Sequence, residues 1–240
     1  MRPLVFRAAA AAATVPSTNR LSRMASSSPT HGGKPRRRAQ NDGPEVRLSK
    51  RLAYLLRHGA AKEGLSLRSD GSIAVGELTK HPKLRNTTFD QIKHIVDTND
   101  KKRFVMFEEP GPGAQPTWYI RASQGHTLEV RELPLVRITP ANAPACIVHG
   151  TTRDKLPAIQ RAGLSRMARN HIHFATGLAG DKGVISGMRA TANAFIYIDI
   201  PKAMAAGIEF YRSENGVVLS EGLGGTGSIP PEYFDRIDSV

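Results

Sequence analysis

The chain of 240 residues has little cysteine and no long apolar run. Its single cysteine, Cys146, excludes an internal disulfide and argues against a cysteine-based zinc site. Cys146 lies inside a short apolar segment, where we expect it to pack as a small hydrophobic residue. No apolar run reaches the ~18–20 residues needed to cross a bilayer, so we expect no membrane-spanning segment.

Acidic residues are absent from the first 41 positions, which contain eight Lys and Arg. An Arg-rich and Ser-rich N-terminus without acids is typical of organellar transit peptides. The basic run 34–38 (KPRRR) equally fits a nuclear import signal or a phosphate-seeking patch. We interpret 1–44 as a basic leader, and leave organelle, nucleus and cytoplasm open as its destination. The formal charge of +13 favours a polyanionic partner, although the leader carries much of it.

Apolar spacing predicts that order begins near Val46. Leu48, Leu52, Leu55 and Leu56 share one face of a helix that Gly59 is placed to end. We expect shorter helices around 75–79 and from 88 onward, then strands over 102–108 and 117–120, joined by the loop 109–116. Helices followed by a two-stranded hairpin are typical of a winged-helix module, which we assign to 45–132.

A linker is predicted over 133–144, which contains three prolines and no helical period. Beyond it, helix 155–161 closes at Gly163, and strands are expected over 146–149, 171–174, 194–200 and 216–219. Several short strands with one clear helix predict a mainly β, mixed lobe over 145–240. The whole chain is therefore expected to be α+β.

Two apolar segments, 145–151 (ACIVHGT) and 171–175 (HIHFA), carry histidine at a strand end. Gly150 follows His149, and a glycine there lets a ligand approach the backbone closely. The alternative is a strand ending at a turn with a hydrogen-bonded histidine. We place His171 and His173 on opposite faces of their strand, so that only one faces a site, and we choose His173.

Basic side chains gather in four other places: Arg57-His58, the segment 121–126, the segment 169–173, and Arg189. Arginine suits phosphate because its planar fork donates two charge-assisted hydrogen bonds. A solvated surface position is the alternative for any one of them. The chain contains no Gly-x-Ser-x-Gly elbow, no His-Glu-x-x-His and no Walker loop. The glycine-rich run 222–227 lacks the Walker lysine and is interpreted as a loop.

Taken together, these segments resemble one family, the NAD-dependent RNA 2′-phosphotransferases. The matching stretches occur in the family's order, cover 47–240 and exclude the leader. They are 48–58, 121–126, 149–151, 163–164, 167–173, 186–189 and 213–217. The resemblance implies an N-terminal winged-helix RNA-binding lobe joined to a C-terminal ADP-ribosyltransferase-like lobe that binds NAD.

The resemblance also implies a reaction and its residues. The 2′-phosphate of a spliced tRNA or other RNA attacks the nicotinamide ribose of NAD+, and a ribose hydroxyl then attacks the phosphorus. No metal is implied, and we expect a monomer. The implied catalytic residues are Arg57, His58, Arg121 and Arg189. The implied NAD contacts are His149, Gly150, Thr151, Arg169, His173 and Ser213. Weaker RNA candidates are Gln124, His126, Lys101, Lys102 and Arg103, for which a structural role or a solvated strand end is the alternative.

Protein-modifying relatives use a glutamate where this chain has the segment 215–218 (NGVV). Its loss suits a phosphate nucleophile, which is already anionic, provided that neither Glu214 nor Glu221 points into the site. Two alternatives stay open: an ADP-ribosyltransferase that caps nucleic-acid phosphates, and a non-catalytic winged-helix protein that binds nucleic acid.

Overall fold

A computed structural model describes residues 42–111, 115–178, 180–181, 184, 187–189 and 191–240. Residues from Asn41 onward form one compact unit. Residues 1–41 of the expected leader lie outside the described residues. The cellular compartment to which the leader directs the chain therefore stays a prediction. No helix in the described ranges is both long and apolar enough to cross a membrane.

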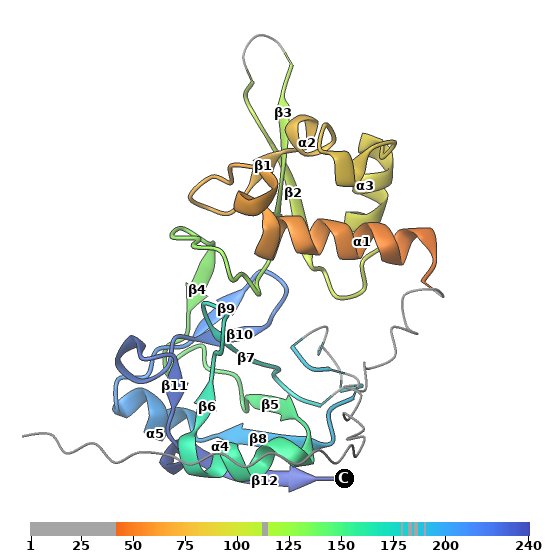
Figure 1. Ribbon diagram of the computed structural model, residues 1–240. Helices are drawn as coiled ribbons and strands as arrows, with labels where there is room; N and C mark the ends of the chain where they lie inside the picture. Colours follow the sequence, from red (N-terminus) through yellow and green to blue (C-terminus); the bar gives the residue numbers. More distant parts are fainter. Residues whose placement is uncertain (1–41, 112–114, 179, 182–183, 185–186, 190) are drawn as a thin grey trace, which may run out of the picture. The chain divides into compact units, whose positions relative to one another are not determined.

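The first helix is continuous with a turn of a different kind. Helix α1 (Pro44–Tyr54) runs directly into a π-helical turn, η1 (Leu55–Gly59) (Figure 1). Leu52, Leu55 and Leu56 are fully buried, which confirms the predicted apolar face. The turn ends at the predicted glycine, where a Cβ would lie 2.5 Å from the Tyr54 ring. π-Helical turns are frequent at functional sites, and this one contains Arg57 and His58.

The remaining N-terminal elements pack around the same core as α1. Helix α3 starts at a capping box between Thr88 and Gln91, as the predicted start at 88 requires. The strands form an antiparallel sheet in the order β1-β3-β2, and the predicted hairpin is β2–β3. The elements are η2 (Ala61–Glu63), β1 (Ile73–Ala74), α2 (Val75–Leu78), η3 (Pro82–Leu84), α3 (Phe89–Asp97), β2 (Phe104–Glu109) and β3 (Thr117–Ala122).

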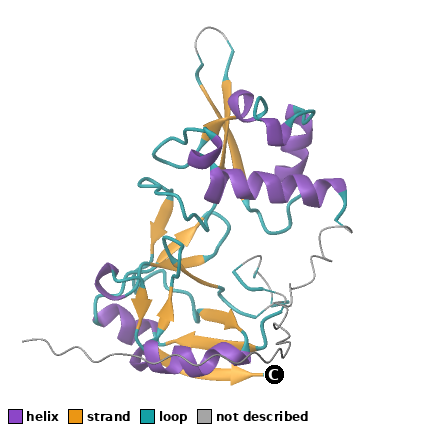
Figure 2. Cartoon of the chain, viewed as in Figure 1, coloured by secondary structure: helices purple, strands orange, loops and turns teal. Residues whose placement is uncertain are grey.

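The C-terminal elements form three antiparallel sheets around a second core (Figure 2). The first is β4 (Leu135–Arg137), β9 (Tyr211–Ser213), β10 (Val218–Ser220) and β7 (Ile172–Phe174), in that order. The second is β12 (Phe234–Ser239), β8 (Ala194–Ile198) and β5 (Val148–Thr151), and the third is β11 (Ser228–Ile229) with β6 (Leu164–Ser165). The helices are η4 (Arg153–Lys155), α4 (Leu156–Ala162), α5 (Ile200–Ala205), η5 (Leu223–Gly225) and η6 (Pro231–Tyr233). The chain is therefore α+β, as predicted.

Several elements were not predicted. Strand β4 lies inside the expected linker 133–144, where it pairs with β9. Helix α5 was also missed, although Asp199 caps it and Pro201 occupies its first turn. Strand β5 starts at Val148, two residues later than expected, because Cys146 and Ile147 precede the ladder with β8.

Candidate functional site

Arg57 and His58 are held by the residues that follow β3. The Arg57 carbonyl accepts hydrogen bonds from the backbone N–H groups of Thr127 and Leu128. The Arg57 side chain lies against Gly125, and its Nη2 donates to the Arg103 carbonyl at 3.5 Å. His58 Nδ1 lies 3.1 Å from Thr127 Oγ1. Residues 127 and 128, which directly follow the predicted segment 121–126, therefore position the π-helical turn.

Cations surround Arg57. Burial lowers the pKa of Arg57 to about 10, and the charges of Arg103 and Arg169 act in the same direction. The pKa of Arg169 is itself lowered by burial and by Arg189. No carboxylate is among the described groups that shift either pKa. Arginines that repel one another in a partly buried place favour an anion, because it relieves that repulsion.

Two buried histidines lie close to these cations. His126 is 3% exposed and His173 is 8% exposed, and within the described residues neither Nε2 has a hydrogen-bond partner. Burial, followed by the charge of Arg57, lowers the pKa of His126 to about 4. Burial, followed by the charge of Arg169, lowers the pKa of His173 to about 3. Both rings are neutral at pH 7, and each offers one nitrogen that only a ligand or water can satisfy.

The placement of His171 and His173 on opposite faces was wrong. Side chains two residues apart in a strand point to the same face. His171 immediately precedes β7, and its charge contributes to the lowered pKa of both His173 and His126. Its Nε2 lies 3.6 Å from Glu221 Oε1. Both histidines therefore border the same cationic region.

His149 sits on β5 with a defined tautomer. Its Nδ1 lies 2.9 Å from the His173 carbonyl, which can only accept, so Nδ1 carries the proton. Burial lowers the pKa of His149, with Arg189 and Arg169 acting in the same direction. The neutral ring therefore presents Nε2 as an acceptor. Its edge-to-face contact with Phe174, at 6.1 Å between centroids, fixes the ring plane.

Gly150 has a packing role that the sequence did not indicate. A Cβ at Gly150 would lie 2.5 Å from Met188 Cγ, so the glycine makes room for the residue before Arg189. Arg189 is exposed. Thr151 is half-buried at the end of β5, and its carbonyl accepts from the Asn193 N–H.

The remaining candidates lie near the turn between β9 and β10. Ser213 is buried, and its Oγ lies 2.9 Å from Asn215 Oδ1 and 2.8 Å from the Val217 carbonyl. Its hydroxyl is therefore already engaged within the turn. Among the weaker RNA candidates, Gln124 is buried, and Lys102 is exposed with a φ of 41°. Within the basic run 101–103, it is the charge of Arg103 that lowers the pKa of Arg57.

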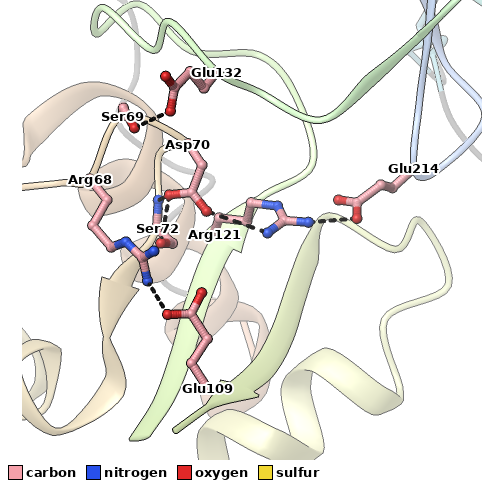
Figure 3. A network of polar contacts seen from close by, with 8 residues as sticks. All are labelled: Arg68, Ser69, Asp70, Ser72, Glu109, Arg121, Glu132 and Glu214. Atoms are coloured by element: carbon pink, nitrogen blue, oxygen red, sulfur yellow. Dashed lines mark hydrogen bonds and ion pairs between the residues drawn. The ribbon is translucent and has the colours of Figure 1, made fainter. Parts of the chain in front are cut away.

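Arg121 has a different environment from the other predicted catalytic residues (Figure 3). Its Nη2 donates to Glu214 Oε1 at 2.6 Å, and its Nη1 lies 3.7 Å from Asp70 Oδ2. The guanidinium also stacks over the Phe107 ring at 4.8 Å. Arg121 is not among the groups that shift the pKa of Arg57, His58, His126 or His173. Glu214 therefore points toward one predicted catalytic residue, Arg121, and it is not among the groups that shift the pKa of Arg57, His58 or His173.

Comparisons with known proteins identify the family of the chain. A family model described as "RNA 2'-phosphotransferase, Tpt1 / KptA family" matches residues 43–222. The tRNA 2'-phosphotransferase 1 of Bos taurus is 45% identical over 205 residues, which cover 85% of this chain and 79% of the relative. That of Danio rerio is 43% identical over 207 residues, which cover 85% of this chain and 90% of the relative.

A putative tRNA 2'-phosphotransferase of Schizosaccharomyces pombe is 46% identical over 206 residues. The match covers 86% of this chain but only 54% of that relative, so the chain spans about half of its length. The matched family region includes α1, the π-helical turn and the β9–β10 turn. The chain belongs to the RNA 2′-phosphotransferase, Tpt1 / KptA family.

Proposed function

We propose that this chain is a transferase that moves the internal 2′-phosphate of spliced tRNA to NAD+. The observation that carries the proposal is the cationic group of Arg57, Arg103 and Arg169 beside the neutral His173. An anion is attracted to the arginines, while a neutral buried imidazole suits an uncharged ribose or amide group. The named relatives are tRNA 2'-phosphotransferases, which supports the same substrate class.

The N-terminal elements act as the winged-helix RNA-binding lobe in this proposal. Support comes from three α-helices packed with a three-stranded sheet that ends in the β2–β3 hairpin. The C-terminal elements act as the ADP-ribosyltransferase-like lobe. Support there comes from the antiparallel sheets that carry His149 on β5 and His173 on β7.

In the first step, an oxygen of the RNA 2′-phosphate attacks C1″ of the nicotinamide ribose. The glycosidic C–N bond breaks, and nicotinamide leaves as a neutral molecule with the bonding electron pair. Arg57 and Arg103 hold the phosphate, whose charge makes a general base unnecessary. His149 Nε2 accepts a hydrogen bond from a ribose hydroxyl, because its Nδ1 proton is committed to the His173 carbonyl. The other NAD contacts in this proposal are Gly150, Thr151 and Arg169. Met188 would have to shift so that the ligand can approach Gly150.

In the second step, the 2″-hydroxyl attacks the phosphorus and the P–O2′ bond breaks. The products are RNA with a 2′-hydroxyl and ADP-ribose 1″,2″-cyclic phosphate. Arg57, Arg103 and Arg189 stabilise the additional charge on phosphorus, by the positioning and electrostatics typical of phosphoryl transfer.

His58 acts as the general base and then the general acid of the second step. The Thr127 hydroxyl donates to the Arg57 carbonyl at 3.3 Å, so it accepts from Nδ1 of His58. This arrangement leaves Nε2 unprotonated in the free enzyme. Burial and Arg57 lower the pKa of His58, which favours the neutral ring. A bound phosphate raises that pKa again, so His58 takes the proton of the 2″-hydroxyl and passes it to the departing 2′-oxygen.

One assay tests the proposed function. Purified protein is mixed with NAD+ and an oligoribonucleotide that carries one internal 2′-phosphate, and the RNA and nicotinamide are followed together. We expect equal amounts of nicotinamide and 2′-hydroxyl RNA, with ADP-ribose cyclic phosphate as the third product. Persistent ADP-ribosylated RNA would instead identify a capping enzyme. RNA binding without nicotinamide release would leave only a nucleic-acid-binding protein.

A further inference from the structure

Two side chains of the turn between β9 and β10 bind the β2–β3 hairpin and the turn that precedes it. Glu214 accepts from Arg121 of β3 at 2.6 Å (Figure 3). The next residue, Asn215, is 3% exposed and donates from Nδ2 to the Lys101 carbonyl at 3.1 Å. These contacts join residues about a hundred positions apart in the chain. They connect elements that belong to different hydrophobic cores.

Both ends of this connection lead to the proposed reaction site. Lys101 stands two residues before Arg103, whose charge acts on Arg57. Strand β10 pairs with β7, and Leu219 is the partner of His173 in that ladder. A displacement of the β9–β10 turn would therefore move the phosphate-binding arginines relative to the proposed NAD-binding histidines.

Arg121 is better suited to this connection than to phosphate. Its side chain is 10% exposed, and two carboxylates already lie within 4 Å of its guanidinium. A phosphate at Arg121 would meet the negative charges of both Glu214 and Asp70. Such a group holds an internal partner in place, whereas Arg57 has only cations among the charges that shift its pKa.

We propose that Glu214 is a positioning residue that, through Arg121, holds the two cores at the separation that the reaction needs. The inference rests on the proposed function, because it concerns the distance between the 2′-phosphate and the nicotinamide ribose. Neither substrate touches Glu214. The residues proposed to hold the phosphate in the first step, Arg57 and Arg103, belong to the N-terminal elements, and those proposed for the nicotinamide ribose belong to the C-terminal elements. The connection therefore governs the reaction of the bound pair more than the binding of either partner.

The first test separates binding from reaction. In Glu214→Gln the side chain keeps its size and loses its charge. We expect the rate of nicotinamide release at saturation to fall by about 10-fold to 100-fold, since a 1 Å misplacement costs up to about 10²-fold. We expect the Kd values for NAD+ and for the 2′-phosphorylated RNA to change by less than about threefold. Glu214→Asp, which keeps the carboxylate, should restore part of the rate.

Glu209→Gln is the matched control. Glu209 also pairs with an arginine, Arg137, but the pair is exposed and stays within one sheet, since Arg137 ends β4 and Glu209 lies two residues before its partner strand β9. We expect this variant to keep the wild-type rate. Equal rates for Glu214→Gln and Glu209→Gln would overturn the proposal. A loss of NAD+ affinity in step with the rate would do so too, because it would indicate damage to one core.

A second readout needs no turnover. The only tryptophan, Trp118, lies on β3 and reports the N-terminal core, whereas circular dichroism reports the whole chain. In Glu214→Gln we expect the urea midpoints from the two probes to separate further than in wild type or Glu209→Gln. NAD+ should raise both midpoints in wild type, and the Trp118 midpoint less in Glu214→Gln. If NAD+ moves neither midpoint in wild type, the proposed function fails. If the two midpoints separate no further in Glu214→Gln, the connection fails.

Discussion

At the scale of single residues, the partners of an arginine decide what it can do. Arg57 and Arg121 were both predicted to be catalytic, and both are partly or fully buried. The charges that act on Arg57 are those of Arg103 and Arg169, whereas Arg121 lies between Glu214 and Asp70. An anion relieves repulsion at the first and competes with two carboxylates at the second. We therefore assign phosphate binding to Arg103 and internal positioning to Arg121.

Arg103→Ala tests that assignment. We expect kcat/KM for the 2′-phosphorylated RNA to fall about 10²-fold to 10³-fold, the usual cost of removing one donor from a charge-stabilising site. Affinity for NAD+ alone should stay unchanged, since the proposed NAD contacts lie on other elements. Lys102→Ala, which removes the exposed neighbouring cation, is the control and should cost less than about threefold. If both variants behave alike, Arg103 contributes only general positive charge.

His126 makes stability depend on pH. Its pKa is about 4 in the folded chain because of burial, and about 6.5 is usual for an unfolded histidine. The unfolded state therefore takes up the proton first. The free energy of unfolding is highest above pH 6.5 and falls as the pH drops toward 4, by at most about 3 kcal/mol from this residue.

The contribution of His126 to this loss of stability can be measured by urea unfolding of wild type and His126→Gln at pH 7 and pH 4.5. Glutamine does not titrate, so the variant should lose about 2 kcal/mol less than wild type over that interval. Equal losses would mean that His126 gains access to water before the chain unfolds.

At the scale of elements, the π-helical turn depends on Gly59. A Cβ there would lie 2.5 Å from the Tyr54 ring, which is itself fixed by a 3.0 Å hydrogen bond from its hydroxyl to Glu63. Gly59→Ala must displace the ring or the turn, and the turn carries Arg57 and His58. We expect lower activity and a loss of stability of about 1–3 kcal/mol. The measurement is the unfolding midpoint together with the rate of nicotinamide release.

Two further variants identify the cause. Tyr54→Ala combined with Gly59→Ala should recover much of the activity, because the ring is then absent. Gly76→Ala is the helical control, since no atom outside its own stretch of helix lies within 4 Å of its Cβ position, and alanine should stabilise that helix slightly. If the double variant stays as inactive as Gly59→Ala, crowding by Tyr54 is not the reason for the glycine.

The elements with a strong local signal were predicted from the sequence. The apolar stripe of Leu52, Leu55 and Leu56 gave the first helix, and Thr88 gave the start of α3. The elements that were missed are held by partners distant in the chain. Strand β4 has only three residues and exists because β9 pairs with it. The π-helical form of η1 likewise depends on tertiary packing, because periodicity alone does not distinguish it from an α-helix.

At the scale of the whole molecule, the same limit applies to the site. The sequence identified the basic segments and the histidine strands but could not pair charges across them. The contact between Glu214 and Arg121 spans 93 positions, and no local pattern predicts it. No local pattern predicts that Met188 packs over Gly150 either. The sequence suggested that Gly150 lets a ligand approach the backbone, whereas the structure shows that it makes room for the Met188 side chain. The sequence therefore showed which residue types could form the site and in what order they occur. The ion-pair partners and packing neighbours of those residues could be found only in the folded structure.

The net charge of +13 leads to a prediction about RNA binding by the full chain. The run 34–38, which lies outside the described residues, contributes four of the cations. Each phosphate neutralised on a single strand adds about 0.7 to the slope of log K against log salt. Replacing Lys34, Arg36, Arg37 and Arg38 by serine should therefore reduce that slope by up to about 3. It should weaken binding of 2′-phosphorylated and unphosphorylated RNA alike.

The rate at saturating RNA should stay unchanged in that variant, because the proposed reaction residues all lie between Arg57 and Ser213. Filter binding at several salt concentrations measures the slope, and single-turnover nicotinamide release measures the rate. An unchanged slope would mean that the leader does not contact RNA. A slower single turnover at saturation would instead give the leader a part in the reaction itself. The salt series and the rate together thus decide whether the leader increases the local concentration of RNA or takes part in positioning it.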